Sequence, residues 1–267
     1  MTDQVPVALV RATNPGPLTG PGTNTWIYGR DETVVIDPGP DDPRHLARVL
    51  EVANRQGRVV MVACTHHHRD HLEGAARLCQ LAGAPLAVHH SLALGANTLP
   101  LHDQDRLLVG ASELVAVHTP GHAADHLCFF AESSRTLFSG DHVLQGTTSL
   151  IVPPDGDMVA YLASLDRVLQ LEPRRLCPGH GEPVEDAPAA IRDLIAHRLE
   201  REAQILRQLE DGPVDPDAVV ARLYRTYPAA VLGMARGTVL AHLLKLEAEG
   251  RVRRVGDGAV DRFELVR

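Results

Sequence analysis

The stretch VVMVACTHHHRDH, residues 59–71, joins an apolar run to a dense group of metal-ligand side chains. The apolar part, residues 59–64, has the length and continuity of a strand buried on both faces, and Leu72–Leu81 carries a helical spacing of Leu and Ala. The histidines are therefore expected in a loop between a strand and a helix. In open α/β architectures that loop lies at the carboxyl edge of the sheet, where ligands bind.

The spacing within the histidine run indicates a metal site. His66 and His68 are two residues apart, so on extended backbone their rings share a face while His67 points the other way. Asp70 and His71 fall in the first turn of the following helix. Zinc is the expected metal because imidazole and carboxylate suit it, and iron or manganese are alternatives because all the donors are nitrogen or oxygen.

Three later segments each end in a further residue that can bind a metal. The run 114–118 leads to His122, the run 136–140 leads to Asp141, and the run 175–179 leads to His180. A glycine directly precedes each of these three residues and lets the backbone approach a shared centre. The three side chains are therefore candidate ligands for the same site.

The pattern H-x-H-x-D-H at residues 66–71 resembles the signature of the metallo-β-lactamase superfamily. The resemblance implies an α/β fold, a four-layer αβ/βα sandwich, built around two divalent metal ions. By position in the superfamily pattern, one ion would be held by His66, His68 and His122, and the other by Asp70, His71 and His180, with Asp141 bridging the two. A hydroxide bridging the ions would be the nucleophile, with Asp70 as the catalytic residue that orients it.

Further strings resemble one branch of that superfamily, the β-lactamase-like protein 2 family. They are NPGP at 14–17, GTNT at 22–25, TPGHAADH at 119–126, SGD at 139–141, GTT at 146–148 and PGHG at 178–181. This family includes metal-dependent endoribonucleases. The resemblance therefore implies activity on single-stranded RNA, and it extends into the C-terminal part of the chain.

The chain divides into a catalytic domain at residues 1–190 and a small winged-helix-like domain at residues 191–267. Three helices are expected in the second part, at residues 197–209, 216–224 and 234–249, from the spacing of their apolar side chains. A hairpin of residues 251–255 and 262–266, turning at residues 256–258, would form the wing.

Charge and composition bear on the partners. Residues 1–191 carry 13 basic and 22 acidic side chains, and the aromatic content of the chain is 3%, so the catalytic domain offers little basic groove or stacking surface for RNA. The chain has no apolar stretch of membrane-spanning length and no signal-peptide pattern at its start, which predicts a cytoplasmic protein without a membrane partner. Formation of a homo-oligomer stays open.

Three functions are compatible with these observations. The ligand set predicts a dinuclear-metal hydrolase that attacks a carbonyl or phosphoryl centre, and the family resemblance narrowly favours single-stranded RNA as substrate. The alternative is a small thioester or lactone, as in glyoxalase II, acyl-carrier thioesterases and quorum lactonases, because such a substrate needs no basic surface. A non-catalytic regulatory protein is the third alternative, but a binding module has no reason to keep seven ligands aligned.

Several polar residues have less certain roles. Asp37 is expected either to orient a histidine ligand or to cap a turn, and Asp125 or His126 to support the site from behind the ligands. The remaining histidines show no motif spacing and are predicted to be surface or packing residues; they are His45, His89, His90, His102, His118, His142 and His197.

The alternation of the histidine rings gives a direct test. We expect His68→Ala to abolish turnover and to lower the metal content of the purified protein, because this ring faces the site. His67→Ala should keep both metals, because its ring faces away. Elemental analysis of the two variants measures this, and an equal loss of metal from both would show that the placement of the rings is wrong.

Overall fold

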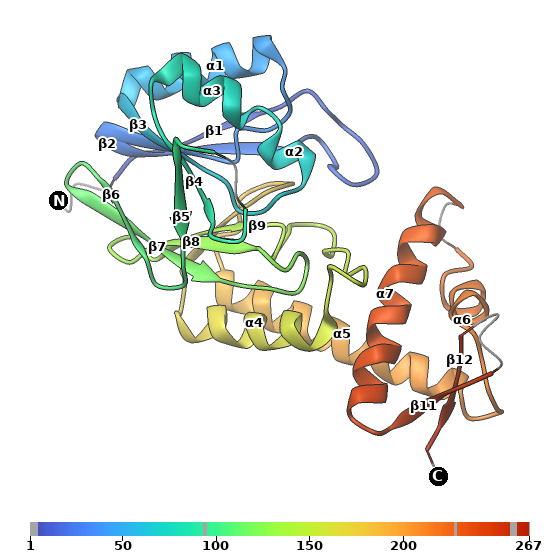
Figure 1. Ribbon diagram of the computed structural model, residues 1–267. Helices are drawn as coiled ribbons and strands as arrows, with labels where there is room; N and C mark the ends of the chain where they lie inside the picture. Colours follow the sequence, from blue (N-terminus) through green and yellow to red (C-terminus); the bar gives the residue numbers. More distant parts are fainter. Residues whose placement is uncertain (1–4, 93–94, 227–228, 257–260, 267) are drawn as a thin grey trace.

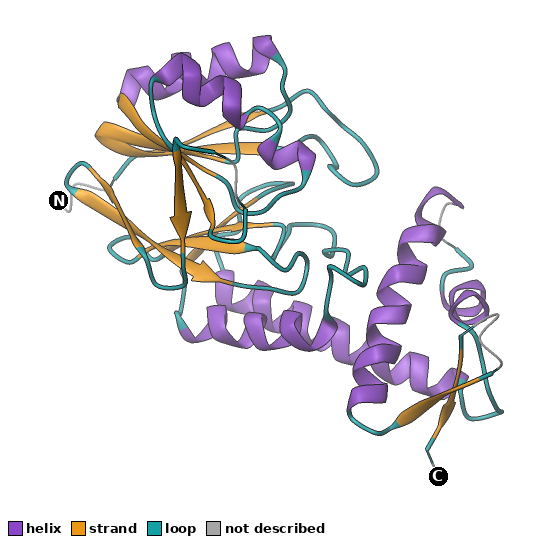
Figure 2. Cartoon of the chain, viewed as in Figure 1, coloured by secondary structure: helices purple, strands orange, loops and turns teal. Residues whose placement is uncertain are grey.

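The computed structural model describes residues 5–92, 95–226, 229–256 and 261–266, and it forms a four-layer sandwich with a smaller domain beside it (Figure 1). Within the described residues, one five-stranded sheet has the order β1-β2-β3-β4-β5 and a second has the order β10-β9-β8-β7-β6. Helices α1 and α3 cover the first sheet, and α4 and α5 cover the second (Figure 2). The predicted αβ/βα fold class is confirmed.

The sandwich is built from strands with helices between them along the chain. They are β1 (Val7–Arg11), β2 (Asn24–Ile36), α1 (Pro43–Gln56), β3 (Gly57–Ala63), α2 (Arg69–Leu72), α3 (Ala75–Ala82), β4 (Leu86–His89), β5 (Thr98–Leu101), β6 (Arg106–Val109), β7 (Ser112–His118), β8 (Leu127–Ala131), β9 (Thr136–Gly140), α4 (Met158–Gln170), β10 (Arg175–Pro178) and α5 (Ala187–Gln208). Strands β2 to β5 run parallel, so their carboxyl ends lie at one edge of the first sheet.

Three apolar layers hold the sandwich together. Between the sheets, Trp26 and Tyr28 of β2 meet Phe138 of β9 edge-on, with ring centroids 6.2 and 5.8 Å apart. One outer layer packs α1 and α3 on the first sheet, and the other packs α4 and the start of α5 on the second. Burial of a large aliphatic or aromatic side chain contributes about 1.5–3 kcal/mol, so these layers fix the two sheets face to face.

The smaller domain follows α5 and contains α6 (Pro216–Leu223), α7 (Ala229–Ala248), β11 (Val252–Val255) and β12 (Arg262–Leu265). Its own core includes Val239, Leu243 and Phe263, together with Ile205 from the last turns of α5. The three-helix and hairpin outline agrees with the predicted winged-helix-like domain. Two residues of the predicted 256–258 turn, Asp257 and Gly258, lie outside the described residues.

Helix α5 is longer than the sequence analysis predicted. It begins at Ala187, and not near His197, because Asp186 caps it by accepting a hydrogen bond from the Ala189 amide and a proline follows in the first turn. Its first half packs under the second sheet, and its second half enters the core of the small domain. The helix therefore runs continuously through position 190, where the domain division was predicted.

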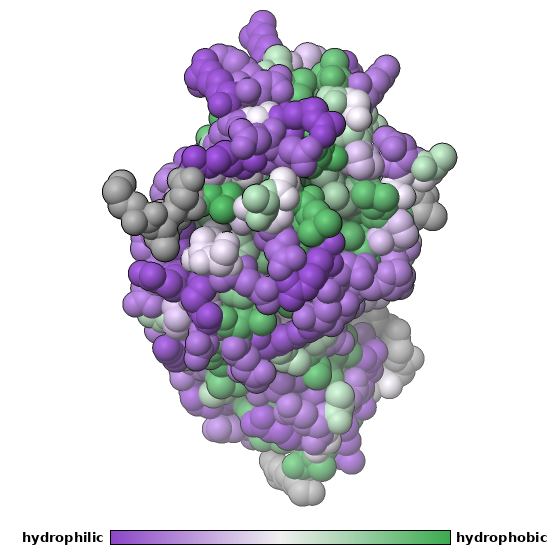
Figure 3. Space-filling model, turned by 90° about the vertical axis from the view of Figure 1, so that its left-hand side faces the viewer, coloured by the Kyte–Doolittle hydropathy of each residue, from purple (hydrophilic) through white to green (hydrophobic). Residues whose placement is uncertain are grey.

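The face shown in Figure 3 is mostly hydrophilic, with small hydrophobic areas scattered among polar side chains. Among the helices of the described residues, none combines the length and the apolar character that crossing a bilayer requires.

A buried ionic cluster attaches the small domain to α5. The carboxylate of Glu202, which is 5% exposed, lies 2.8 Å from Lys245 Nζ on α7 and 3.1 Å from an Arg251 guanidinium nitrogen beside β11. Burial opposes ionisation of Glu202, but hydrogen bonds from His242 and Lys245 lower its pKa to about 2. The charge of this carboxylate therefore contributes to stability.

We expect Glu202→Gln to lower the free energy of unfolding by about 2–3 kcal/mol at pH 7, because it removes the buried carboxylate and leaves Lys245 and Arg251 with only the partly exposed Glu249 as anion. The folded-state pKa of Glu202 lies below its unfolded-state value, so this stabilisation is present above about pH 4.3 and is lost as the pH falls towards 2. Urea unfolding at pH 7 and pH 3 measures it. The exposed neighbour Glu200→Gln is the control and should change little. A deficit for Glu202→Gln that is as large at pH 3 as at pH 7 would contradict this assignment.

Candidate metal centre

The loops at one edge of the two sheets bring together seven side chains. His66 and His68 follow β3, Asp70 and His71 belong to α2, and the other three follow β7, β9 and β10; these are His122, Asp141 and His180. Their donor atoms converge in overlapping groups, of which two share no residue: His66 with His68 and His122, and Asp70 with His71 and His180. A third group joins His66, His71 and Asp141. The structure thus assembles in one place all seven residues that the sequence analysis singled out.

The first group consists of three imidazoles. His68 Nδ1 lies 2.9 Å from His66 Nε2 and 3.1 Å from His122 Nε2. His122 donates its Nδ1–H to the Leu150 carbonyl at 2.7 Å, so Nε2 carries the free lone pair that faces the group. Three ring nitrogens at these separations match the donor set of a tetrahedral metal with one open position.

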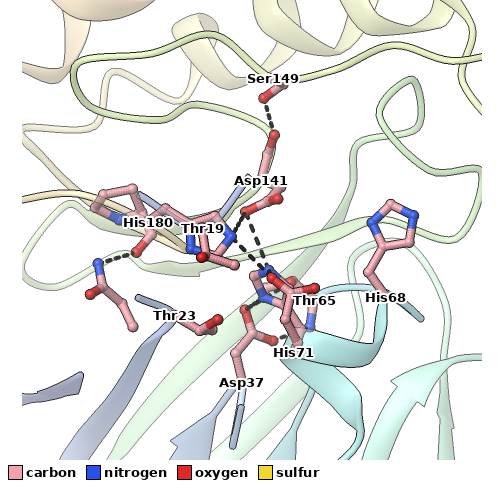
Figure 4. Close-up of polar contacts among 12 residues, drawn as sticks. Thr19, Thr23, Asp37, Thr65, His68, His71, Asp141, Ser149 and His180 are labelled. Atoms are coloured by element: carbon pink, nitrogen blue, oxygen red, sulfur yellow. Dashed lines mark hydrogen bonds and ion pairs between the residues drawn. The ribbon is translucent and has the colours of Figure 1, made fainter. Parts of the chain in front are cut away.

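The second group contains the carboxylate of Asp70 and the imidazoles of His71 and His180. Asp70 Oδ2 lies 3.2 Å from His180 Nε2 and 3.5 Å from His71 Nε2. The Asp141 carboxylate lies between the groups: its Oδ1 is 3.4 Å from both of these ring nitrogens, and its Oδ2 is 3.7 Å from His122 Nε2 (Figure 4). Asp141 is therefore placed to bridge two ions.

Buried polar atoms without partners support this interpretation. His71 Nε2 and Asp141 Oδ1 are both buried, and neither has a hydrogen-bond partner among the described residues. Leaving such atoms unpaired costs about 1–3 kcal/mol each, and more where a charge is involved. A divalent cation between them would satisfy both, so the residues fit a metal site.

The pKa values of the histidines differ between the two groups. Burial opposes protonation of His71 and His180, yet the Asp141 carboxylate raises the pKa of His71 well above its ordinary value and that of His180 to about 9. Burial and the neighbouring imidazoles instead lower the pKa of His66 and bring that of His68 to about 4. The carboxylate-rich group therefore attracts a cation, and the imidazole group stays neutral and able to coordinate.

Asp37 orients one of the ligands. Its Oδ2 accepts a hydrogen bond from His71 Nδ1 at 2.8 Å and another from Thr65 Oγ1 at 2.9 Å, and its Oδ1 accepts from the Thr65 amide at 2.7 Å. The bond to Nδ1 fixes the His71 tautomer, so Nε2 offers its lone pair to the site. Of the two roles predicted for Asp37, the structure supports the histidine-orienting one.

His126 and Asp125 have separate positions. His126 is fully buried, and its Nε2 accepts a 3.2 Å hydrogen bond from the Asp141 amide, so it holds the backbone of the bridging residue. Asp125 Oδ1 is 2.8 Å from His67 Nδ1. The His67 ring lies 4.8 Å from the His68 ring and lines the same cleft, and its Nε2 is 3.8 Å from Asp155. His67, His68 and Asp155 therefore form a further group of converging donor atoms.

An arginine of α5 also supports the loop that carries Asp141. Arg198, which is 3% exposed, lies over the Tyr161 ring and donates a hydrogen bond to the Ser149 carbonyl. The Ser149 hydroxyl donates in turn to the Asp141 carbonyl (Figure 4). Sequence reasoning missed these contacts because Arg198 and Ser149 are 49 residues apart and Ser149 and Asp141 are 8 apart, and neither spacing forms a motif.

The ligands open on a cleft of about 740 Å³ between the sandwich and the small domain. The sandwich contributes Leu144, Leu150 and Val152, the loop before β2 contributes Leu18, and α7 contributes Met234. Residues His197, Arg198, Arg201 and Tyr224 complete the wall. His197 was predicted to be a surface or packing residue, but the structure places it in this wall.

The other histidines without motif spacing lie away from the seven ligands or bury their rings behind them. His89 stacks on His118 and lies against His90, which stacks on His102, with centroids 4.3–4.6 Å apart. His45 Nε2 lies 3.0 Å from the Thr25 hydroxyl. These positions agree with their predicted surface and packing roles.

Comparison with known proteins gives two family matches. The model described as "Metallo-beta-lactamase superfamily" matches residues 18–180, which include all seven candidate ligands. The model described as "Beta-lactamase associated winged helix domain" matches residues 216–262.

Individual proteins resemble the chain over most of its length. A "Beta-lactamase-like protein 2 homolog" of Drosophila melanogaster is 32% identical over 270 residues, which are 92% of this chain and 89% of that protein. An "Atrochrysone carboxyl ACP thioesterase" of Aspergillus chevalieri is 32% identical over 278 residues, 97% of this chain and 87% of that protein. The solved structure of a beta-lactamase domain protein from Burkholderia ambifaria has a TM-score of 0.85 at 22% identity, covering 97% of this chain and 91% of that one.

The contact between Asp37 and His71 yields a prediction. Asp37→Asn keeps the size of the side chain but removes the carboxylate that fixes the His71 tautomer, so the affinity for metal should fall about 10- to 100-fold. Competition with a zinc-chelating dye measures the affinity. Asp125→Asn is the matched control, because Asp125 contacts His67 and none of the seven. Equal effects of the two substitutions would show that Asp37 does not orient a ligand.

Proposed function

Because the chain belongs to the metallo-beta-lactamase superfamily, we propose that it is a dinuclear-metal-dependent hydrolase acting on a small acyl thioester. The observation that carries the proposal is the bounded cleft beside the metal-ligand side chains, whose exposed surface is mostly apolar although polar residues also line it. A cavity of 740 Å³ suits a drug-sized substrate, and apolar walls suit an acyl chain. The relative from Aspergillus chevalieri is named an ACP thioesterase, which agrees with this choice.

Zinc is the proposed metal at both positions, with iron or manganese as alternatives for the same nitrogen and oxygen donors. Such ions would lower the pKa of a water molecule and polarise the thioester carbonyl. The proposed ligands are His66, His68 and His122 for one ion and Asp70, His71 and His180 for the other, with Asp141 between them.

The chain's own residues have distinct tasks in the reaction. Asp70 opens on the cleft, with its side chain 30% exposed, so it can orient the attacking water and accept its proton. Asp37, His126 and Arg198 keep the ligands in position through the hydrogen bonds described above. The leaving group is a thiolate, whose conjugate acid has a pKa of about 8.5, so its departure needs no protonation by the enzyme.

Single-stranded RNA is the second candidate, favoured by the sequence resemblance and by the basic side chains in the cleft wall. These include Arg69, His197, Arg198 and Arg201. Arg69 forms an ion pair with Glu73. Arg198 is already bonded to the Ser149 carbonyl, which leaves few cations for a polyanionic strand. A strand also needs an open groove with stacking surfaces, whereas this cleft is walled by two domains.

A substrate panel tests the proposal. Metal-loaded protein should hydrolyse acyl thioesters of N-acetylcysteamine with a kcat/KM at least about 100-fold above that for an acyl-homoserine lactone or a single-stranded RNA. S-lactoylglutathione serves as a further thioester. Asp70→Asn should lose at least about 100-fold in kcat, in line with the size of general-base contributions. Cleavage of RNA with a KM that rises steeply with salt, and no thioester hydrolysis, would contradict the proposal.

A further inference from the structure

Helix α5 presents Arg198 and Arg201 to the cleft that holds the metal-ligand side chains. The two lie three residues apart, which is about 4.5 Å along a helix axis. The guanidinium carbon of Arg201 lies 4.5 Å from the centre of the Tyr224 ring, and Tyr224 belongs to the segment just after α6. Tyr224 of the small domain therefore holds Arg201 in place in the wall of the cleft.

The charge of Arg201 is not neutralised by its neighbours on the helix. Glu200 pairs with Arg207 at 3.2 Å, and Glu202 pairs with Lys245 and Arg251. Among the described residues, no carboxylate forms an ion pair with Arg201, and its guanidinium contacts the Tyr224 ring. A guanidinium that is stacked but not paired, inside a cleft, is ready to bind an anion.

Arg198 adds to the same positive surface. It is 3% exposed, and its Nε, although buried, has no hydrogen-bond partner among the described residues. Burial, followed by the charges of Arg198 and Arg201, lowers the pKa of His197 beside them. This part of the wall therefore carries an uncompensated positive potential, while Asp70 and Asp141 supply the negative charge on the metal side.

We propose that Arg201, stacked on Tyr224, binds a carboxylate at the far end of the substrate's acyl chain. This inference rests on the thioester function proposed above. Leu150, Val152 and Met234 line the same cleft and suit a short run of methylene groups. Arg198, one turn away, already reaches the segment that holds Asp141, so the subsite for the anion lies in the same cleft as the metal-ligand side chains. That position fits an acyl carboxylate better than a phosphate at the end of a long carrier arm.

A binding experiment tests the subsite without relying on hydrolysis. Isothermal titration calorimetry of metal-loaded protein compares the affinities for glutarate and pentanoate. Both are five-carbon acids, but only glutarate carries a second carboxylate. Wild-type protein should bind glutarate at least about 10-fold more tightly, and Arg201→Gln should remove the difference. Arg207→Gln, an exposed arginine on the same helix, should keep it. A preference for glutarate that persists in Arg201→Gln would overturn the proposal.

Kinetics with matched thioesters separates this proposal from the function on which it rests. Wild-type kcat/KM should favour glutaryl- over pentanoyl-N-acetylcysteamine about 10-fold or more, through KM, and Arg201→Lys should retain part of the preference. Hydrolysis of both without discrimination would overturn the subsite alone. If no thioester is cleaved while glutarate still binds through Arg201, the subsite stands and the proposed function fails. A preference for pentanoyl-coenzyme A over pentanoyl-N-acetylcysteamine that Arg201→Gln removes would show that Arg201 binds a phosphate of the carrier. That result would overturn the carboxylate assignment.

Discussion

The Asp141 carboxylate is buried between two groups of imidazoles, and each of its oxygens faces a different group. An ionised carboxylate loses several kcal/mol of hydration free energy when it leaves water, so nearby positive charge must compensate for this loss. Burial opposes its ionisation, but the neighbouring His71 and His180 hold its pKa well below the ordinary value. The surrounding loops can therefore be understood as a frame that keeps donor atoms around this one anion.

Much of the frame consists of close backbone approaches that only particular residues allow. At Gly179, an added Cβ would lie 2.5 Å from Asp141 Oδ1 and 2.7 Å from His71 Cε1, so any side chain there would displace the centre. At Gly140, the φ of 48° and the nearby Thr65 hydroxyl and His126 ring impose the same limit. Helix α5 completes the frame from outside, because one of its arginines supports the Asp141 loop and the next faces the cleft.

The sequence predicted the elements whose causes are local. The histidine run and the three strand-turn units led to all seven converging side chains, and the apolar spacing of residues 216–224 predicted the helix that α6 forms at Pro216–Leu223. The start of α5 was missed because its cap, Asp186, lies outside the apolar stripe. The contacts of Asp37 with His71 and of Arg198 with Ser149 span 34 and 49 residues, so they depend on the packing of the sheets and no local pattern encodes them.

The central claim is that Asp141 lies between two metal ions. Anomalous X-ray diffraction from crystals of protein purified without chelator, recorded at the absorption edge of the bound metal, tests it directly. The account predicts two anomalous peaks per chain, about 3.5–4 Å apart, one against His66, His68 and His122 and the other against Asp70, His71 and His180. A single peak in fully active protein, or two peaks with Asp141 bound to neither, would contradict it.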